Sequence, residues 1–451
     1  MSALSLSSHT PDDVLARIEG RYPPIPSQAD AIIIGGGIMG LATAFYMAGA
    51  GLKVLVIEKD RVAGQQSGRN WGFVRTQYRD PAEMPLAVEA LRLWRGLEAE
   101  LGTPVGWRET GCLFAASNEP EYEAFAAWLK SVDGIARSSR LLNRSETATL
   151  LPALKQGTAG ALYTPDDGQA EPGEATSAFA KAARGLGVQI LEDCGAIEID
   201  VAGGRVKGVY TEHGRIAADI VVCAAGAVSH QLLRSLSLVL PQKTVRNTVS
   251  LTTVAPRLSQ PCFCGFGLGL RQRADGSCII AAESMSDVDV TLGSFTNIKY
   301  FLGSFLANRR SFQLNVGRAL LDDLYALMVR GRDERRVEPR RPFLPPNEKR
   351  AATMKALLGK LFEGADSLGI VKSWAGAIDV LPDALPVIDG TTGVSGLIVA
   401  TGFSGHGFGL APAVGKAVSG IAQGQAPSLG LEAFRLDRFA KGTFGQPHAP
   451  L

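Results

Sequence analysis

Four short apolar runs divide the chain, and glycines follow three of them. The runs lie at residues 31–34, 53–57, 220–223 and 397–400, with no alternation of polar and apolar positions inside them. Runs of this length without alternation are typical of strands buried on both faces of a parallel sheet. The pattern therefore predicts an α/β protein whose central strands are covered on both sides.

The segments between these runs predict helices and a hairpin. One helix follows the first glycine turn and ends near Gly49, and a long amphipathic helix begins at about Asp80. Another helix begins at about Pro412, after the last glycine turn. Residues 187–212 predict three strands, with Gly203-Gly204 as a hairpin turn.

Residues 288–345 hold two amphipathic helical patterns surrounded by arginines. Apolar residues recur at helical spacing in two groups, Ile298, Phe301, Leu302, Phe305 and Leu306, and Leu320, Leu324 and Leu327. The arginines around them are Arg309, Arg310, Arg318, Arg330, Arg332, Arg335, Arg336, Arg340 and Arg341. Such a hairpin suits docking on a membrane or another subunit, and it equally suits capping of the chain's own active site. Neither helix is apolar all round, which argues against a membrane span.

Charge and cysteine usage exclude several classes of protein. The chain has 46 Lys+Arg and 44 Asp+Glu, and this net charge of +2 argues against a nucleic-acid-coating or strongly acidic protein. The six cysteines show no metal-like spacing, and Cys262-x-Cys264 is interpreted as two small strand residues rather than a redox or metal pair. The N-terminus lacks the basic start and apolar run of a secretory signal. We expect a cytoplasmic protein without a metal, with peripheral membrane association as the alternative.

The glycine content is high, and the first glycine cluster has a specific spacing. The chain has 52 glycines among 451 residues. Gly35-x-Gly37-x-x-Gly40 follows the first run, and Glu58 ends the second run. Strand, glycine turn, helix, strand and acid in this order form the dinucleotide-binding fingerprint, in which the helix N-terminus faces the pyrophosphate. The fingerprint alone does not separate FAD from NAD.

Three further glycine clusters predict close approaches of backbone to a ligand. Residues 64–72 form a glycine-rich loop that contains Trp71, and such a loop can wrap a large bound ligand. The run at 220–223 ends in Ala224-Ala225-Gly226, and the run at 397–400 leads into the glycines of 402–409. The N–H groups of such turns can hold an electron-rich group.

These motifs together resemble a known family. The motifs are, in order, GGGIMGLATAFYMAGAG with VIEKD, SGRNWGFVRTQY, VVCAAGAVSHQL, WAGAIDVLPDALPVI and TGFSGHGFGLAPAVG. They resemble the FAD-dependent oxidoreductases related to D-amino acid oxidase, glycine oxidase and sarcosine oxidase, and the last motif is similar to the sarcosine oxidase branch. The resemblance covers nearly the whole chain except residues 1–28 and 288–345.

The resemblance implies a discontinuous two-domain architecture. A Rossmann-like FAD-binding domain would collect residues 29–80, 155–240 and 365–440. An α+β substrate domain on a mixed or antiparallel sheet would collect residues 81–154 and 241–364, with the basic helical insertion at 288–345. Residues 1–28 would form an N-terminal extension.

The resemblance also implies the residues around a non-covalently bound FAD. Gly376 lacks a neighbouring cysteine, so the covalent link of some relatives is not expected. The expected cofactor residues are Gly35, Gly37, Ile38, Met39, Gly40, Glu58, Lys59, Ser67, Arg69, Asn70, Trp71, Gly72, Ala196, Ala225, Gly226, Gly376, Gly402, Ser404, Gly405, His406, Gly407 and Phe408.

Members of the family oxidise a C–N bond in an amine or amino acid, and the imine product hydrolyses. The resemblance places Arg75 at the substrate carboxylate, with a surface arginine as the alternative reading and Arg271 as a weaker candidate. His406 is expected to contact the flavin rather than act as a base. Oxygen or a quinone would accept the electrons.

One departure from the family pattern keeps other functions open. Gly409 stands where the sarcosine oxidase branch often has a lysine for the substrate carboxylate. The alternatives are an FAD-dependent dehydrogenase of another bond, such as C–O in a hydroxy acid, and a flavin-binding subunit of a larger complex.

Overall fold

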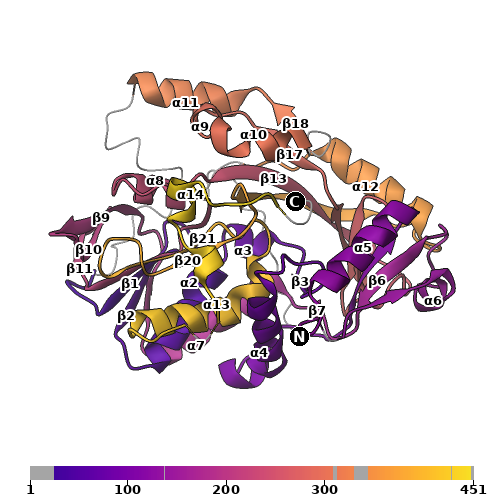
Figure 1. Cartoon of the computed structure of the whole chain (residues 1–451), viewed down its shortest axis with the longest axis horizontal. Helices are drawn as coiled ribbons and strands as arrows, with labels where there is room; N and C mark the ends of the chain where they lie inside the picture. The colour runs from indigo at the N-terminus through magenta and orange to yellow at the C-terminus, as the bar shows by residue number, and fades with distance from the viewer. Residues whose placement is uncertain (1–24, 137, 308–311, 330–343, 428, 448–451) are drawn as a thin grey trace.

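The computed structural model describes residues 25–136, 138–307, 312–329, 344–427 and 429–447. Two large sheets lie on opposite sides of the molecule, with helices and loops between and around them (Figure 1). This arrangement confirms the expected α/β class.

The first sheet contains all four apolar runs as strands. Its order is β20-β21-β12-β1-β2-β8, parallel from β21 to β8 and antiparallel at the β20 edge. The bounds are β20 (Val387–Asp389), β21 (Leu397–Thr401), β12 (Ile220–Cys223), β1 (Ala31–Ile34), β2 (Val54–Ile57) and β8 (Gln189–Leu191). The predicted buried parallel sheet is therefore correct.

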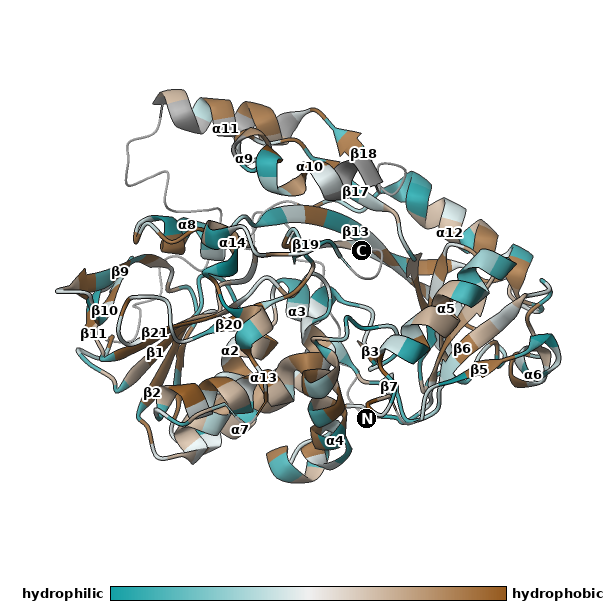
Figure 2. Ribbon diagram, viewed as in Figure 1, coloured by the Kyte–Doolittle hydropathy of each residue, from teal (hydrophilic) through white to brown (hydrophobic). Residues whose placement is uncertain are grey.

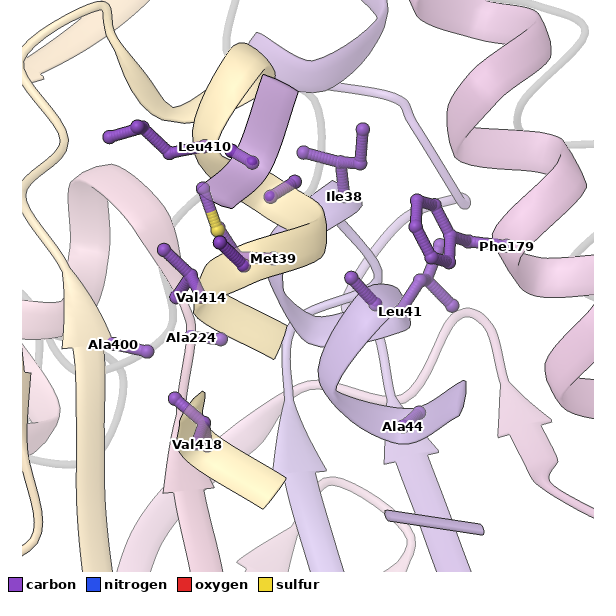
Figure 3. Close-up of a cluster of buried hydrophobic side chains, with 14 of the residues drawn as sticks. Ile38, Met39, Leu41, Ala44, Phe179, Ala224, Ala400, Leu410, Val414 and Val418 are labelled. Atoms are coloured by element: carbon purple, nitrogen blue, oxygen red, sulfur yellow. The ribbon is translucent and has the colours of Figure 1, made fainter. Parts of the chain in front are cut away.

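Alternate side chains of these strands pack on opposite faces of the sheet. Ile33 and its counterparts on the same face pack against a helical layer, and Figure 3 shows Leu41 next to Phe179 in that layer. The layer consists of α2 (Ile38–Gly49), α4 (Met84–Leu101), α7 (Pro172–Gly185) and α13 (Gly407–Ala422). Ile32 and its counterparts pack on the other face, against the small β9–β11 sheet. Burial on both faces explains the absence of alternation in the sequence.

The predicted three-strand segment divides between two sheets. β8 joins the edge of the parallel sheet, whereas β9 (Ala196–Ala202) and β10 (Arg205–Thr211) form an antiparallel hairpin with β11 (Gly214–Ala217). The turn is Gly203-Gly204, as predicted, with φ of 60° and 73°. Both values lie in the left-handed region that a two-residue hairpin turn requires.

Two predicted helix starts were wrong by four to five residues. α13 begins at Gly407, not at Pro412, so Pro412 lies in its second turn. Pro412 has no N–H to donate to the carbonyl of Phe408, and the first turn forms without that bond. Trp94 Nε1 donates to the carbonyl of Gly409 at 2.8 Å and ties this turn to α4. α4 itself begins at Met84 rather than at about Asp80.

The second large sheet is mixed and mainly antiparallel. Its order is β18-β17-β13-β16-β15-β14-β4-β6-β5, with β19 paired to β13 off this path. Its strands are β4 (Cys112–Ala116), β5 (Arg140–Leu142), β6 (Gly160–Thr164), β13 (Lys243–Val254), β14 (Cys262–Gly265), β15 (Leu268–Gln272), β16 (Ser277–Ala282), β17 (Ser286–Asp289), β18 (Phe312–Asn315) and β19 (Ile370–Val380). β6 and β19 belong to this sheet, although their segments were expected in the FAD-binding domain.

Helices and short elements complete the fold. α12 packs its apolar face on the second sheet through Met354 and Leu358. The remaining elements are α3 (Gln66–Arg69), β3 (Phe73–Val74), α5 (Glu119–Ser131), α6 (Arg144–Leu150), β7 (Gly168–Gln169), α8 (Ser229–Arg234), α12 (Glu348–Leu361) and α14 (Arg438–Lys441), with 3-10 turns at Gly226–Val228 and Glu432–Phe434.

The insertion forms a layer of its own above β13 (Figure 1). It contains α9 (Leu292–Thr296), α10 (Ile298–Ala307) and α11 (Arg318–Val329), so both predicted amphipathic helices are present. Figure 2 shows hydrophobic residues along α11 of this layer. Eight large apolar side chains are exposed there, namely Phe295, Ile298, Leu302, Leu314, Val316, Leu321, Tyr325 and Met328.

Part of the predicted basic pattern lies outside the described residues. This applies to Arg309, Arg310, Arg330, Arg332, Arg335, Arg336, Arg340 and Arg341, and to the side chains of Phe305, Leu306, Arg318 and Leu327. Within the described ranges, no helix is long and apolar enough to cross a membrane.

Candidate active site

A cavity of about 1850 Å³ lies between the two large sheets. The carboxyl ends of β1, β2, β12 and β21 open into it. The next strand of the sheet after β1 lies on one side (β2), whereas those after β12 lie on the other (β20 and β21), so the strand order reverses between β1 and β12. Open α/β sheets bind ligands at such switch points. All the expected cofactor residues line the cavity except two, Gly40 and Gly402.

The glycine fingerprint makes the tight contacts that its spacing predicts. A Cβ on Gly35 would lie 2.3 Å from the carbonyl oxygen of Ala224, and one on Gly40 would lie 2.0 Å from the carbonyl oxygen of Gly35. The N–H of Ile38 donates to Ser67 Oγ at 2.9 Å. Only glycine fits these positions, so strand, turn and helix approach closely enough to cradle a pyrophosphate.

Glu58 directly follows β2 and lies beside the glycine turn. Its Oε2 accepts the N–H of Gly36 at 2.6 Å, and its Oε1 accepts the N–H of Asp60 at 2.8 Å. Burial raises the pKa of Glu58, and these two bonds oppose that change. Each carboxylate oxygen retains a lone pair that suits a ribose hydroxyl.

The loop at 64–72 crosses from the fingerprint to β19. Arg69 Nη1 donates to the carbonyl of Ala375 at 3.1 Å, and Trp374 Nε1 donates to the carbonyl of Arg69 at 3.0 Å. Gly72 has φ of 85°, and a Cβ there would lie 2.4 Å from the carbonyl oxygen of Ala170. These contacts fix the loop along the cavity, where the sequence predicted a wrapping segment.

The glycine turn after β21 is fastened to the end of β19. Asp379 Oδ2 accepts the N–H of Gly402 at 3.0 Å and Gln242 Nε2 at 3.1 Å. The carbonyl of Asp379 accepts the N–H of Ser404 at 3.0 Å. Burial raises the pKa of Asp379 to about 6. Asp379 and Gln242 were missed from the sequence, although an acid inside the apolar stretch at 375–381 was a usable signal.

His406 lies at the end of this turn and is buried against α4. Its Nδ1 is 3.2 Å from Glu83 Oε2, and its carbonyl accepts Arg79 Nη2 at 3.4 Å. Burial, followed by the charge of Arg79, lowers the pKa of His406 to about 4. The imidazole is therefore neutral at pH 7, which suits a position beside a ring system.

Arg75 lines the part of the cavity next to β4. Its guanidinium lies over the ring of Phe114, 5.3 Å from the centroid, and Nη1 donates to the carbonyl of Gln77. The segment that carries it is held by Asp167, whose Oδ1 accepts the N–H and Oγ1 of Thr76 at 2.8 Å. Burial raises the pKa of Asp167 to about 6.

Arg271 does not line the cavity. It is 2% exposed, and its Nη1 lies 2.8 Å from Glu171 Oε1. Because Glu171 already neutralises its charge, Arg271 holds β15 to the segment before α7 instead of facing a ligand.

The residues present fit a bound FAD. The close backbone contacts at Gly35 and Gly40 form a tight turn before α2, and Glu58 and the N-terminus of α2 suit the ribose and phosphates of FAD. A parallel sheet with glycine turns at a switch-point cavity defines the class of dinucleotide-binding oxidoreductases. The family described as FAD dependent oxidoreductase matches residues 30–421, and the chain belongs to this family. The resemblance found in the sequence is thereby confirmed, with FAD as the cofactor.

Known relatives match the chain over different extents. Mitochondrial sarcosine dehydrogenase from Homo sapiens is 31% identical over 216 residues, 46% of this chain and 24% of that protein. Sarcosine oxidase subunit beta from Rhizobium meliloti (strain 1021) is 27% identical over 94% of this chain and 91% of that protein. L-Amino acid deaminase from Proteus myxofaciens, solved in complex with anthranilate, has a TM-score of 0.85 and 25% identity over 94% of this chain and 96% of that chain. The chain spans about a quarter of the length of the mitochondrial sarcosine dehydrogenases.

Proposed function

We propose that this protein uses non-covalently bound FAD to oxidise a C–N bond in a small amine or amino acid. The observation that carries the proposal is Arg75, which faces the cavity beside the glycine turn. Among the described residues, no carboxylate lies within ion-pair distance of it, so its charge is available to a substrate carboxylate. The named relatives support this reading, because their names refer to sarcosine and L-amino acids.

The proposal assigns roles to the cofactor, to Arg75 and to the glycine turn after β21. Bound FAD supplies an acceptor for the hydride that leaves the carbon next to nitrogen. Arg75 holds the substrate carboxylate and so orients that carbon. The N–H groups of Gly407 and Phe408, at the start of α13, would offer donors to the electron-rich edge of the flavin ring. The N–H of His406 is already bonded to the carbonyl of Phe403, and its neutral imidazole would add no charge there. The imine product is released to water and hydrolyses.

The test is anaerobic bleaching of the purified yellow protein. We expect an amine or amino acid to remove the flavin absorbance near 450 nm, roughly the usual position for oxidised flavins, and air or a quinone to restore it. A hydroxy acid that bleaches the flavin while no amine does would favour the alternative oxidoreductase. Failure of every compound, with restoration only after a partner protein is added, would favour the flavin-binding subunit.

We further propose that residues 288–345 dock on an anionic membrane surface. The eight exposed apolar residues of this layer are the lipid-facing candidates, and Met328 is 78% exposed. Nine arginines occur in the same stretch of sequence, from Arg309 to Arg341. Exposed apolar side chains, in a segment whose sequence is rich in arginine, favour an interface with anionic lipid headgroups. Docking there would favour a membrane quinone over oxygen as electron acceptor.

Sedimentation with lipid vesicles tests this surface. We expect the FAD-loaded protein to bind vesicles of phosphatidylserine and phosphatidylcholine, and binding to fall when Leu321→Ser and Met328→Ser are combined. Val254→Ser with Val371→Ser is the matched control, because these valines are 68% and 61% exposed but lie outside the insertion. Absence of vesicle binding together with a dimer that Leu321→Ser and Met328→Ser dissociate would assign the surface to a second copy instead.

A further inference from the structure

Three strands of the second sheet align three cavity-lining residues in one row. Gly376 of β19 is directly opposite Asn247 of β13, and Val249 of β13 is opposite Ala281 of β16. β16 ends at Ala282, and Asn247 Nδ2 donates to the carbonyl of Ala282 at 3.5 Å, so Asn247 lies at the strand end that Glu283 follows. Opposite residues in an antiparallel pair point to the same face. Gly376 and Asn247 therefore share a face of the sheet, and both line the cavity together with Glu283.

Two hydrogen-bond acceptors of this row lack the donors that their chemistry calls for. Asn247 Oδ1 is buried without a hydrogen-bond partner. Glu283 Oε2 accepts the N–H of Gly267 at 3.1 Å, but within the described ranges no lysine, arginine or histidine forms an ion pair with it. A carboxylate that lines a cavity without a cation, close to a buried amide oxygen without a donor, offers two acceptors to a ligand that carries N–H groups.

The charged and titratable groups around Glu283 do not supply that cation. Glu121 of α5 adds negative charge, and burial with this charge raises the pKa of Glu283 to about 7. Cys264 of β14 faces both Glu283 and Arg75, and burial keeps its thiol neutral by raising its pKa well above the usual value. Tyr78 also lines this part of the cavity, and burial raises its pKa. Arg75 is the nearby cation in the proposed function, where it is assigned to the substrate carboxylate.

We infer that Asn247 and Glu283 form the subsite for the substrate's amino group. This inference rests on the proposed function. Asn247, next to Gly376, accepts an N–H of the substrate nitrogen. The Glu283 carboxylate accepts a proton from the substrate ammonium: one N–H bond breaks, one O–H bond forms, and the neutral amine remains bound. Only the neutral amine has the nitrogen lone pair that assists loss of hydride from the adjacent carbon.

A binding experiment separates this subsite from turnover. 2-Aminoisobutyrate has no hydrogen on its α-carbon and is not oxidised there, and isobutyrate lacks only the amino group. In calorimetric titrations of the FAD-loaded protein, we expect the amino compound to bind about tenfold more tightly, as for a charge-assisted hydrogen bond. We expect Glu283→Gln to remove this preference and Asn247→Ala to reduce it. Glu283→Gln keeps an oxygen for the N–H of Gly267, so the strand end is retained.

Glu123→Gln is the matched control, because Glu123 is an exposed carboxylate of the same helix, α5, and does not line the cavity. It should leave the preference for the amino compound unchanged. A Glu283→Gln variant that keeps normal flavin absorbance and the full preference would overturn the inference.

The pH profile of flavin bleaching gives a second readout. In the native protein, the bleaching rate should rise with pH through about 7 as Glu283 loses its proton. In Glu283→Gln, the rate at pH 7 should be roughly 100-fold lower and should recover only near the pKa of an alkyl ammonium, about 10. Identical profiles for the two proteins would contradict the role of Glu283, whereas no bleaching of the native protein by any amine would instead contradict the proposed function.

Discussion

At the scale of single residues, the cavity depends on glycines whose neighbours leave no room for a side chain and on polar residues whose partners lie far away in the sequence. Gly35 and Gly72 were recognisable because no other residue fits such close contacts, and their spacing is a local property. Asn247 and Glu283 were missed because only the pairing of distant strands brings them together. Arg271 was a candidate by residue type, yet the sequence carried no sign that Glu171 neutralises it.

Arg75 gives the first prediction at this scale. Arg75→Ala should raise KM for a carboxylate-bearing substrate by roughly 10- to 100-fold, the equivalent of a charge-assisted hydrogen bond of about 1.5–3 kcal/mol. The corresponding amine without a carboxylate should be affected little. Steady-state kinetics with both compounds measure the difference. Arg140→Ala is the control, because Arg140 also lies over an aromatic ring, 5.6 Å from the Tyr163 centroid, but outside the cavity. An equal loss for both compounds would remove Arg75 from the carboxylate site.

Asp379 gives a prediction about pH. Its pKa is raised in the folded protein from 3.8 to about 6, so the folded state binds more protons than the unfolded state between these values. The contribution of Asp379 to stability therefore decreases as pH rises from about 4 to 6. Asp379→Asn removes this contribution. The difference in unfolding free energy between the two proteins should therefore shift in favour of the variant by up to about 3 kcal/mol across that interval. Thermal unfolding of both proteins from pH 4 to 7 measures it, and parallel curves would contradict it.

At the scale of elements, continuous apolar runs and glycine turns predicted strands accurately and helix starts less well. The four runs became strands because burial on both faces demands uninterrupted apolar residues. α13 began five residues early because Trp94 of α4 supports its first turn, and this contact depends on packing rather than local sequence. β6 and β19 pair with strands of the second sheet, although their segments were expected in the FAD-binding domain, and this pairing also depends on tertiary packing rather than local sequence.

The crossing of α2 and α13 gives a prediction for elements. A Cβ on Gly415 would lie 2.7 Å from the backbone carbon of Ala42, so Gly415→Ala must separate the two helices. The clash should outweigh the gain in helix propensity and destabilise the protein by about 1–3 kcal/mol. Gly420→Ala in the same helix is the control, because its nearest contact would be 3.4 Å away, and it should stabilise by up to about 1 kcal/mol. Chemical denaturation measures both, and equal effects would refute the close crossing.

At the scale of the whole molecule, the cavity joins the two large sheets, so FAD should stabilise them together. Removal of FAD should lower the melting temperature, and FAD at 100 times its Kd should restore about 2.7 kcal/mol of stability. FMN lacks the adenosine half that Glu58 and Ala196 are proposed to hold, and it should restore less at equal concentration. Melting curves with each nucleotide test this. Equal stabilisation by FMN and FAD would show that the part of the cavity around Glu58 contributes nothing to the affinity for FAD.

The strand order also constrains how the chain is made. β12 at 220–223 lies between β1 and β21, but β21 is synthesised only at 397–401. At roughly 5–20 residues per second, the ribosome needs about 9–36 seconds to cover that interval. During this time β12 is an apolar strand with one open edge, which is the kind of edge that pairs with other chains. The late C-terminal segment therefore both completes the cofactor pocket and closes the nascent chain's main aggregation site.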